Sequence, residues 1–370
     1  MTDNENNYYD ISGIDAQDAV YNLIYGKRSN GKTFAVCRKI LEAYFDEGLP
    51  SAIIRRLDEM IKPKNIEKLF NPHIEYIIEK TEGQYNSIFY RSNSFYLCCY
   101  EGDMKIAQAK EPFCRTYSIN TAETTKGQDA GEVKYIFFDE FITRQFYLSN
   151  EFVLYQNLLS SIIRNRANIK IYMVANTTSK YCPYFREMGL TRMKDQKQGT
   201  IDLYTVGVTQ TRIAVEYADA PGGGDNVSKY FCFDNPELDM ITTGAWEIAL
   251  YRHIPKGVGS LSPEVRFYIA FDGQVLQGGL YILNDAPLLA ISRRYKEIKD
   301  PENNIIYSDN LDDPPDPNPL HQTNLAITPT RAHETILSLI KQHKTYFADN
   351  EDGETFANYL KWATKGGLKV

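Results

Sequence analysis

Apolar residues in the first half of the chain fall into short continuous runs separated by stretches with helical spacing. Continuous runs at residues 20–25, 49–56, 134–141 and 169–175 predict buried strands. Apolar residues recur every three or four positions over 150–165, which predicts a helix between the last two of these strands. Strands that alternate with helices indicate an α/β fold built on a central, mostly parallel sheet.

The segment between the second and third of these strands has a different pattern. Residues 57–80 predict helices that are broken at Pro63 and Pro72, because a proline inside a helix removes a hydrogen bond and clashes with the preceding turn. Residues 85–100 predict a hairpin that turns at Ser92–Asn93. We therefore expect short helices followed by antiparallel strands here.

The second half of the chain is organised differently. Pro221–Asp225 (PGGGD) has the most flexible composition of the whole chain and is typical of a linker. A β-meander is predicted over 264–293, with a hairpin signal at Asn284–Asp285. Two helices are predicted near 330–346 and 353–364. This mixture indicates a second domain of α+β type.

These patterns predict four segments along the chain. They are a flexible N-terminal arm over 1–17, an α/β domain over 18–205, a linker over 206–228 and an α+β domain over 229–370. The length of 370 residues fits two domains. No apolar run is long enough for a membrane span, and the polar, acidic start is not a secretory signal.

Composition and charge limit the classes of function. Hydrophobic residues make up 43% of the chain and charged residues 24%, which excludes general disorder. A net charge of −7 excludes a protein that coats nucleic acid with its whole surface. Residues 161–200 nevertheless carry eight Lys or Arg against two acids, which predicts a local surface that faces either a polyanion or solvent. The six cysteines lack CxxC spacing, so free thiols and no metal cluster are expected.

The strongest motif is a phosphate loop between the first strand and a helix. The sequence GKRSNGKT fits the pattern GxxxxGK[ST] in full. Backbone N–H groups of such a loop surround phosphate oxygens, and the following helix N-terminus adds positive charge. We expect Lys32 to reach the β- and γ-phosphates of ATP and Thr33 to bind Mg²⁺. The expected nucleotide-binding residues of the loop are Gly26, Lys27, Arg28, Ser29, Asn30, Gly31, Lys32 and Thr33.

A second motif follows the third apolar strand. The run YIFF ends in Asp139 and Glu140, a Walker B pattern, and a buried strand delivers such acids to the sheet edge where ligands bind. Asp139 would hold Mg²⁺ through water, and Glu140 would act as the general base on the attacking water. An acid directly after the Walker B aspartate is typical of hydrolysing motor ATPases.

Two polar features nearby have two interpretations each. Asn176 follows the strand at 169–175, where it would either sense the γ-phosphate or simply make a turn. Arg164 and Arg166 end the predicted helix, where an arginine could act in trans on a neighbouring subunit's nucleotide or merely complement the helix dipole. The residues alone favour the dipole interpretation for the arginines and leave the one for Asn176 open.

Taken in order, these motifs resemble those of the DNA-packaging ATPases of phi29-type tailed phages. The resemblance covers roughly residues 20–190 and is weaker over the β-meander. It rests on the combination of GKRSNGKT, IIRR, TTKGQ, FFDEF, IIRNR and VANTTSKYCPYF. The resemblance implies an ASCE-type phosphate-loop ATPase domain. It also implies a C-terminal domain similar to a ribonuclease H-like nuclease that has lost its activity.

The resemblance further implies partners and a place of action. The family forms a homomeric ring, typically of five subunits, docked on the portal of an empty procapsid. The ring threads double-stranded DNA inward using ATP and Mg²⁺, so the chain would work in the host cytoplasm and transiently at the portal vertex. A structural packaging RNA stays an open question, because its use does not carry over from the motifs.

The resemblance also assigns residue roles beyond the phosphate loop. It makes Arg164 the arginine finger presented to the neighbouring subunit and Lys126 a second trans-acting cation. Arg55 and Arg56 match paired arginines near the nucleotide. In the C-terminal domain, Asp272 and Asp285 lie in hairpin-turn dipeptides, so no nuclease activity is expected.

Three hypotheses follow. The first is a ring-forming DNA translocase with ATP at subunit interfaces. The second is another phosphate-loop enzyme, such as a helicase-like nucleic-acid-dependent ATPase or a nucleotide kinase. A helicase should show nucleic-acid motifs across a second motor domain, and none is evident in the sequence. The third is a non-catalytic scaffold that binds nucleotide for structure, against which the intact Glu140 argues.

Overall fold

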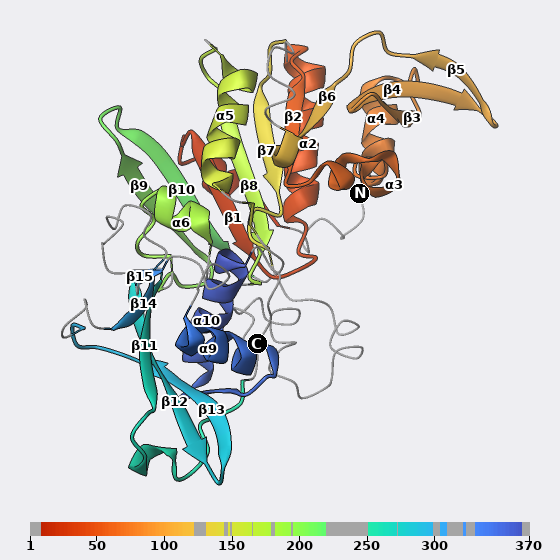
Figure 1. The fold of residues 1–370 in the computed structure, drawn as a ribbon. Coiled ribbons are helices and arrows are strands. Elements are labelled where there is room, and N and C mark those ends of the chain that lie inside the picture. The colour runs from red at the N-terminus through yellow and green to blue at the C-terminus, as the bar shows by residue number, and fades with distance from the viewer. Residues whose placement is uncertain are drawn as a thin grey trace. The chain divides into compact units, whose positions relative to one another are not determined.

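The chain divides into two compact units, which are described separately (Figure 1). The computed structural model describes residues 9–121, 131–143, 147–148, 150–164, 166–178, 182–193, 195–219, 251–271, 273–298, 304–308, 321–322 and 330–364. Pro221–Asp225 and the acidic, proline-rich sequence at 309–320 lie outside these residues.

The first unit is built on a ten-stranded sheet, counted over the described residues, with a parallel centre. The parallel strands run in the spatial order β6, β2, β7, β8, β1 and β10. Their bounds are β1 Tyr21–Gly26, β2 Ser51–Arg55, β6 Cys114–Ser118, β7 Tyr135–Asp139, β8 Lys170–Asn176 and β10 Thr211–Ala218. The α/β prediction is therefore confirmed. Strand β8 lies between β1, which precedes the predicted phosphate loop, and β7, which ends in the predicted Walker B aspartate.

Antiparallel strands extend this sheet at both edges. A hairpin of β3 Ser87–Arg91 and β4 Ser94–Glu101 carries β5 Met104–Gln108 beside it, and β9 Thr200–Val206 pairs with β10. Positive φ angles of 50° and 55° at Ser92–Asn93 make the predicted hairpin turn. The sequence patterns did not predict β5, β6, β9 or β10.

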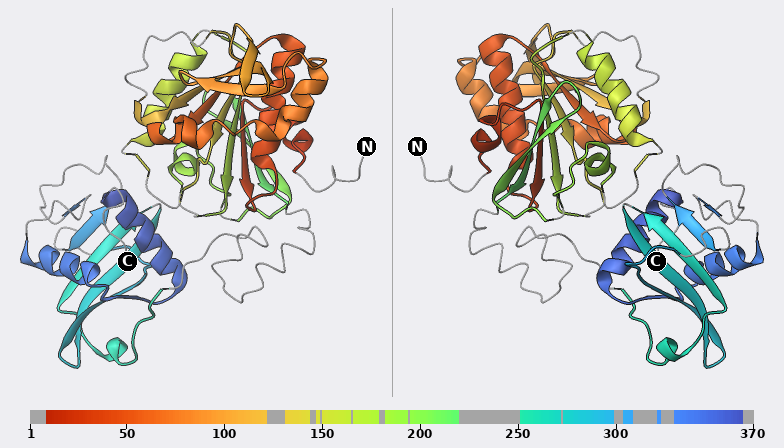
Figure 2. Two further views of the ribbon diagram at one scale, coloured as in Figure 1. Left: turned by 90° about the vertical axis from the view of Figure 1, so that its right-hand side faces the viewer. Right: turned by 90° about the vertical axis from the view of Figure 1, so that its left-hand side faces the viewer.

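Helices cover both faces of this sheet. Figure 2 shows α5 on one face and α2 with α4 on the other. Pro63 begins α3 and Pro72 lies in η3, so the predicted breaks are confirmed. The helix bounds are α1 Ser12–Asp15, α2 Lys32–Glu47, η2 Asp58–Ile61, α3 Pro63–Ile66, η3 Asn71–His73, α4 Ile74–Lys80, η4 Ile119–Thr121, α5 Glu151–Ile163 and α6 Pro183–Glu187.

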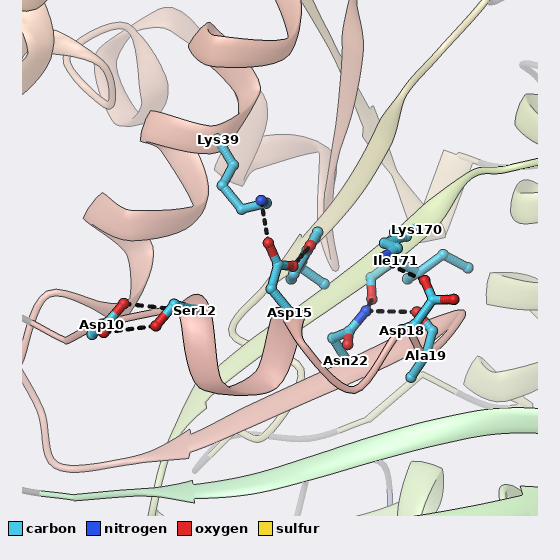
Figure 3. Close-up of polar contacts among 10 residues, drawn as sticks. Asp10, Ser12, Asp15, Asp18, Ala19, Asn22, Lys39, Lys170 and Ile171 are labelled. Atoms are coloured by element: carbon cyan, nitrogen blue, oxygen red, sulfur yellow. Dashed lines mark hydrogen bonds and ion pairs between the residues drawn. The ribbon is translucent and has the colours of Figure 1, made fainter.

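The segment that precedes β1 is bound to the sheet. Tyr9 and Ile14 are buried among core residues. Asp15, at the end of α1, forms an ion pair with Lys39 of α2 and accepts a hydrogen bond from the hydroxyl of Tyr172 on β8 (Figure 3). These contacts tie α1 to both α2 and the sheet.

The predicted flexible arm over 1–17 is therefore wrong for residues 9–17. The sequence here is mostly polar, but Ile14 is fully buried and Ile11 packs against the core. Two apolar anchors in a short stretch are too few to give a periodic signal. Residues 1–8 lie outside the described part of the chain.

The predicted linker over 206–228 is also corrected. Thr211–Ala218 form β10, which pairs in parallel with β1 from Tyr21↔Ile213 to Gly26↔Ala218. The glycines that follow this stretch suggested a boundary too early, because a strand of eight residues gives a weak signal beside them. The first unit thus continues at least to the end of β10.

Buried tyrosines, rather than phenylalanines, fill several core positions beneath loops. The hydroxyl of Tyr25 donates to Gln196 Oε1 at 3.0 Å, and that of Tyr90 donates to the carbonyl of Ile61 at 2.6 Å. Each ring packs in the core while its hydroxyl bonds a polar group nearby. This explains part of the high tyrosine content, 27 residues.

The second unit is a six-stranded sheet, within the described residues, covered by two helices. Its strand order is β15-β14-β11-β12-β13-β16, with an antiparallel centre and parallel outer pairs. Positive φ angles at Asn284–Asp285 make the predicted turn, while Asp272 lies outside the described residues. The bounds are η6 Val258–Ser260, β11 Val265–Phe271, β12 Gln274–Leu283, β13 Ala286–Arg293, β14 Ile305–Ser308, β15 His321–Gln322, α9 Arg331–Lys341, β16 Thr345–Phe347 and α10 Asn350–Ala363.

Replacing the anchor Ile14 tests whether the N-terminal segment is part of the core. Ile14→Ala should lower the free energy of unfolding by about 2–5 kcal/mol, because it removes a fully buried side chain. The matched control is Val20→Ala, whose side chain is 42% exposed and whose loss should cost less than about 0.5 kcal/mol. Urea denaturation measures both, and equal small effects would show that the segment is loose.

Candidate functional site

The phosphate loop joins β1 to α2, and its backbone requires glycine at two positions. Gly26 has φ 152°, and a Cβ there would lie 2.9 Å from the carbonyl oxygen of Ala218. Gly31, with φ 94°, is the N-cap of α2. Glycine adopts these two φ angles without strain, whereas any other residue would be strained there. The loop thus ends at the N-terminus of a 16-residue helix, whose N–H groups and dipole favour an anion.

Lys32 is a buried cation at the start of α2. Its side chain is 4% exposed, and its Nζ donates to the carbonyl of Lys27 at 2.5 Å and to Asn30 Oδ1 at 3.0 Å. Burial lowers the pKa of Lys32 to about 7, and the nearby charge of Asp139 partly offsets this effect. Both contacting oxygens are uncharged, so a phosphate in the loop would stabilise the ammonium.

The acidic strand end lies beside the loop. Asp139 is the last residue of β7, and its Oδ1 accepts a hydrogen bond from Thr33 Oγ1 at 3.3 Å. Its Oδ2 lies 2.5 Å from an Nη of Arg55, the last residue of β2. Parallel strands end at one edge of the sheet, which is why residues from three elements meet here.

Glu140 turns sharply away from β7. Its φ is 62°, and its N–H donates to the carbonyl of Val174 on β8 at 2.8 Å. Its carboxylate is 52% exposed and lies 3.4 Å from Arg55. A non-glycine residue at positive φ is uncommon and often marks a functional position.

The phosphate loop, the start of α2 and the ends of β7 and β8 line one cavity of about 370 Å³. Asn176 at the end of β8 lies on its wall. The lining residues are Ser29, Asn30, Gly31, Lys32, Thr33, Phe34, Asp139, Glu140, Val174, Ala175 and Asn176. The structure therefore brings the predicted loop and the predicted acids together, and the sequence did not single out Phe34.

Other described residues that the sequence predicts for the site do not line this cavity. Lys27 is buried and contributes its carbonyl to Lys32, whereas Arg28 is exposed. Lys126 lies outside the described residues. Arg56 points away from the cavity and forms an ion pair with Glu151 in the interior. Sequence reasoning missed Glu151, although it is the only charged residue of α5.

The two arginines after α5 differ from each other. Arg166 donates from Nη1 to the carbonyl of Ile162 at 3.0 Å, so it satisfies the end of the helix. Arg164 is exposed and has φ 49°, a left-handed value that turns the chain out of the helix. The side-chain hydrogen bond of Arg166 to the last turn of α5 therefore fits the dipole interpretation for that residue.

Among the described residues, no group of three or more His, Cys, Asp or Glu is placed to hold a metal ion, and the cysteines carry free thiols. No helix in the described part of the chain has the length and apolar character needed to cross a membrane.

A glycine-rich loop at the end of a central parallel strand, facing an acid on the next strand but one, defines a phosphate-loop α/β protein. Residues 3–208, more than half of the chain, match the model of the podovirus DNA encapsidation protein (Gp16) family. The chain therefore belongs to this family of DNA encapsidation proteins.

Solved structures share the fold at low sequence identity. The phi-28 gp11 DNA packaging motor is 17% identical, with a TM-score of 0.52, over 96% of this chain and 99% of that one. The bacteriophage phi-29 viral genome packaging motor assembly is 17% identical, with a TM-score of 0.54, over 95% and 99%. A comparison with curated proteins found no match.

Affinity of this cavity for a nucleoside triphosphate should fall above pH 7 because of Lys32. The pKa of its ammonium is about 7 in the free protein, and a bound triphosphate raises it. Between these two pKa values binding takes up a proton, so affinity should fall roughly tenfold per pH unit. Titration calorimetry from slightly below pH 7 to about pH 9 measures this slope.

Lys32→Arg is the matched control, because arginine keeps its charge at every pH tested. The variant should retain binding without the extra slope. If the natural protein and Lys32→Arg lost affinity equally with rising pH, the titrating group would not be Lys32.

Proposed function

We propose that this DNA encapsidation protein is an ATP-hydrolysing motor that moves double-stranded DNA into a procapsid. The observation that carries the proposal is one cavity lined by a buried lysine, a hydroxyl–carboxylate pair and a half-exposed glutamate. These are the groups needed to bind a triphosphate and to activate water. Membership of the DNA encapsidation family indicates DNA as the substrate that is moved. The cavity indicates hydrolysis of a nucleoside triphosphate as the source of energy.

The residues fit a nucleotide and its Mg²⁺ ion. Thr33 Oγ1 and Asp139 Oδ1 lie 3.3 Å apart and are the oxygen ligands that Mg²⁺ prefers. When bound, Mg²⁺ would be held by Thr33 and Asp139 and would supply charge neutralisation at the phosphates. Lys32 and the N–H groups of the loop would orient the phosphates, and the proposal gives Asn176, which lines the same cavity, a contact with the terminal one.

Glu140 takes the general-base role. Its exposed carboxylate lines the cavity and can accept a proton from a water molecule. Arg55 contacts both acids, at 2.5 Å from Asp139 and 3.4 Å from Glu140. Such a shared guanidinium fixes the orientation of two neighbouring carboxylates.

Hydrolysis is completed by cations from a neighbouring subunit. Arg164 is exposed at the end of a rigid helix, which is the placement expected of a side chain that serves another subunit. The resemblance to phi29-type packaging ATPases adds Lys126 as a second such cation. It also supplies the homomeric ring, typically a pentamer, and the portal at which the ring works. We extend both to this chain.

The second unit is proposed to be an inactive ribonuclease H-like domain. Its strand order places an antiparallel meander at the centre, with β14 and β15 parallel to the first meander strand. The ribonuclease H-like domain is implied by the resemblance to phi29-type packaging ATPases, and this strand order supports it. Asp285 occupies a turn at φ 60°, which accounts for its presence without nuclease chemistry. The domain would contact the portal or a packaging RNA.

The alternatives account for less of the structure. A helicase-like enzyme would have a second motor domain, whereas the described part of the second unit is a six-stranded sheet with an antiparallel centre. A nucleotide kinase does not need an exposed arginine at a helix end. A scaffold that only binds nucleotide does not need Glu140. The place of action would be the host cytoplasm and, during packaging, the portal vertex.

Two substitutions and their mixture test the shared site. Glu140→Gln removes the base and Arg164→Ala removes the finger, so each should lower the ATPase rate of purified protein by about 10³-fold or more in the presence of DNA. Mixing the two variants should restore part of the rate, because a Glu140→Gln subunit still presents Arg164 to an intact neighbouring site.

The matched control is Arg166→Ala, which removes a helix-capping arginine two positions away. It should retain most of the activity. Full activity of Arg164→Ala at a dilution where the protein is monomeric would contradict the trans role, and failure of both variants to bind ATP would point to misfolding instead.

A further inference from the structure

Arg56 joins the turn at Glu140 to the start of α5. The guanidinium is 3% exposed and donates from its two Nη atoms to the carbonyls of Glu140 at 3.1 Å and Phe141 at 2.9 Å. Its Nε donates to both carboxylate oxygens of Glu151, at 3.0 Å and 2.9 Å. One planar, buried fork therefore binds two segments that are distant in sequence.

Glu151 is equally buried and has a further partner. Its side chain is 1% exposed, and its Oε1 accepts a hydrogen bond from the hydroxyl of Tyr184 on α6 at 2.8 Å. A buried carboxylate is stable only when paired in this way, so its position is tied to that of Arg56. The residue is also the first of α5, where negative charge stabilises the helix.

The helix α5 is continuous from Glu151 to Ile163. Its 13 residues span about 20 Å, and Arg164 follows directly. The centroid of the Tyr155 ring lies 5.2 Å from the ring centroid of Phe138 on β7 and 5.5 Å from that of Tyr184. A displacement at the start of the helix is therefore passed to its end, because close-packed interiors transmit strain.

We propose that Arg56 and Glu151 are a positioning pair that couples each subunit's own catalytic site to the arginine it presents to its neighbour. The inference rests on the proposed function, since it requires Arg164 to act in trans. A shift of the Glu140 backbone during the reaction cycle moves Arg56, then Glu151 and α5, and so relocates Arg164. The position of Arg164 in the neighbouring subunit's catalytic site then depends on the step of the reaction cycle reached in the subunit that presents it.

The test uses subunits whose own site is already inactive. Glu140→Gln subunits serve as finger donors to Arg164→Ala subunits, and ATP hydrolysis by the mixture is measured. A second donor carries Glu140→Gln together with Arg56→Lys, which keeps the positive charge but cannot make the fork. A third carries Glu140→Gln with Arg192→Lys, the same change at an exposed arginine.

The donor with only Glu140→Gln is called the simple donor. The Arg56→Lys donor should restore roughly 10- to 100-fold less activity than the simple donor, as expected for a catalytic group displaced by about 1 Å. The loss should fall on kcat with KM for ATP unchanged, because the acceptor sites are intact. The Arg192→Lys donor should equal the simple donor. Equal restoration by the Arg56→Lys donor would overturn the proposal.

A milder donor keeps the test decisive if Arg56→Lys disturbs folding. Tyr184→Phe in the Glu140→Gln background removes one hydrogen bond from Glu151 and leaves the ion pair, so restoration should drop about two- to fivefold. An unchanged rate from a folded Tyr184→Phe donor would also count against the proposal. If even the simple donor restores nothing, the trans arrangement of the proposed function fails, which is a different result.

Discussion

Two adjacent arginines at the end of β2 hold the acidic side of the site together. Arg55 contacts Asp139 and Glu140 in the cavity, and Arg56 contacts Glu151 in the interior. Successive residues of an extended chain point to opposite sides, so one dipeptide serves the cavity and the interior at once. The three carboxylates of Asp139, Glu140 and Glu151 each contact one of these two guanidinium groups, and the carbonyls of Glu140 and Phe141 accept hydrogen bonds from Arg56.

This arrangement explains why an acidic chain can carry out the proposed work. The net charge of −7 describes the surface as a whole, whereas the chemistry depends on a few buried cations. Lys32 is buried beside uncharged oxygens, and Arg56 is buried against one carboxylate. Burial makes each of these charges count for more than an exposed one, because little water screens them.

The sequence predicted those parts of the fold and site that have a local signal. The loop with Lys32, the strand that ends at Asp139 and the helix α5 follow from a motif and from apolar spacing. It did not predict the buried anchors Tyr9 and Ile14 or the strand β10, because each depends on contacts with distant parts of the chain. Glu151 was missed for the same reason, since its partner lies 95 residues away.

The central claim is that each catalytic site is completed by a neighbouring subunit. Its most direct test is the ATPase rate per subunit of the natural protein, measured with double-stranded DNA over a series of dilutions that crosses from assembled ring to monomer. The account predicts that the rate per subunit falls steeply as the ring dissociates, because Arg164 leaves the neighbouring site. An unchanged rate per subunit in the monomer would contradict it.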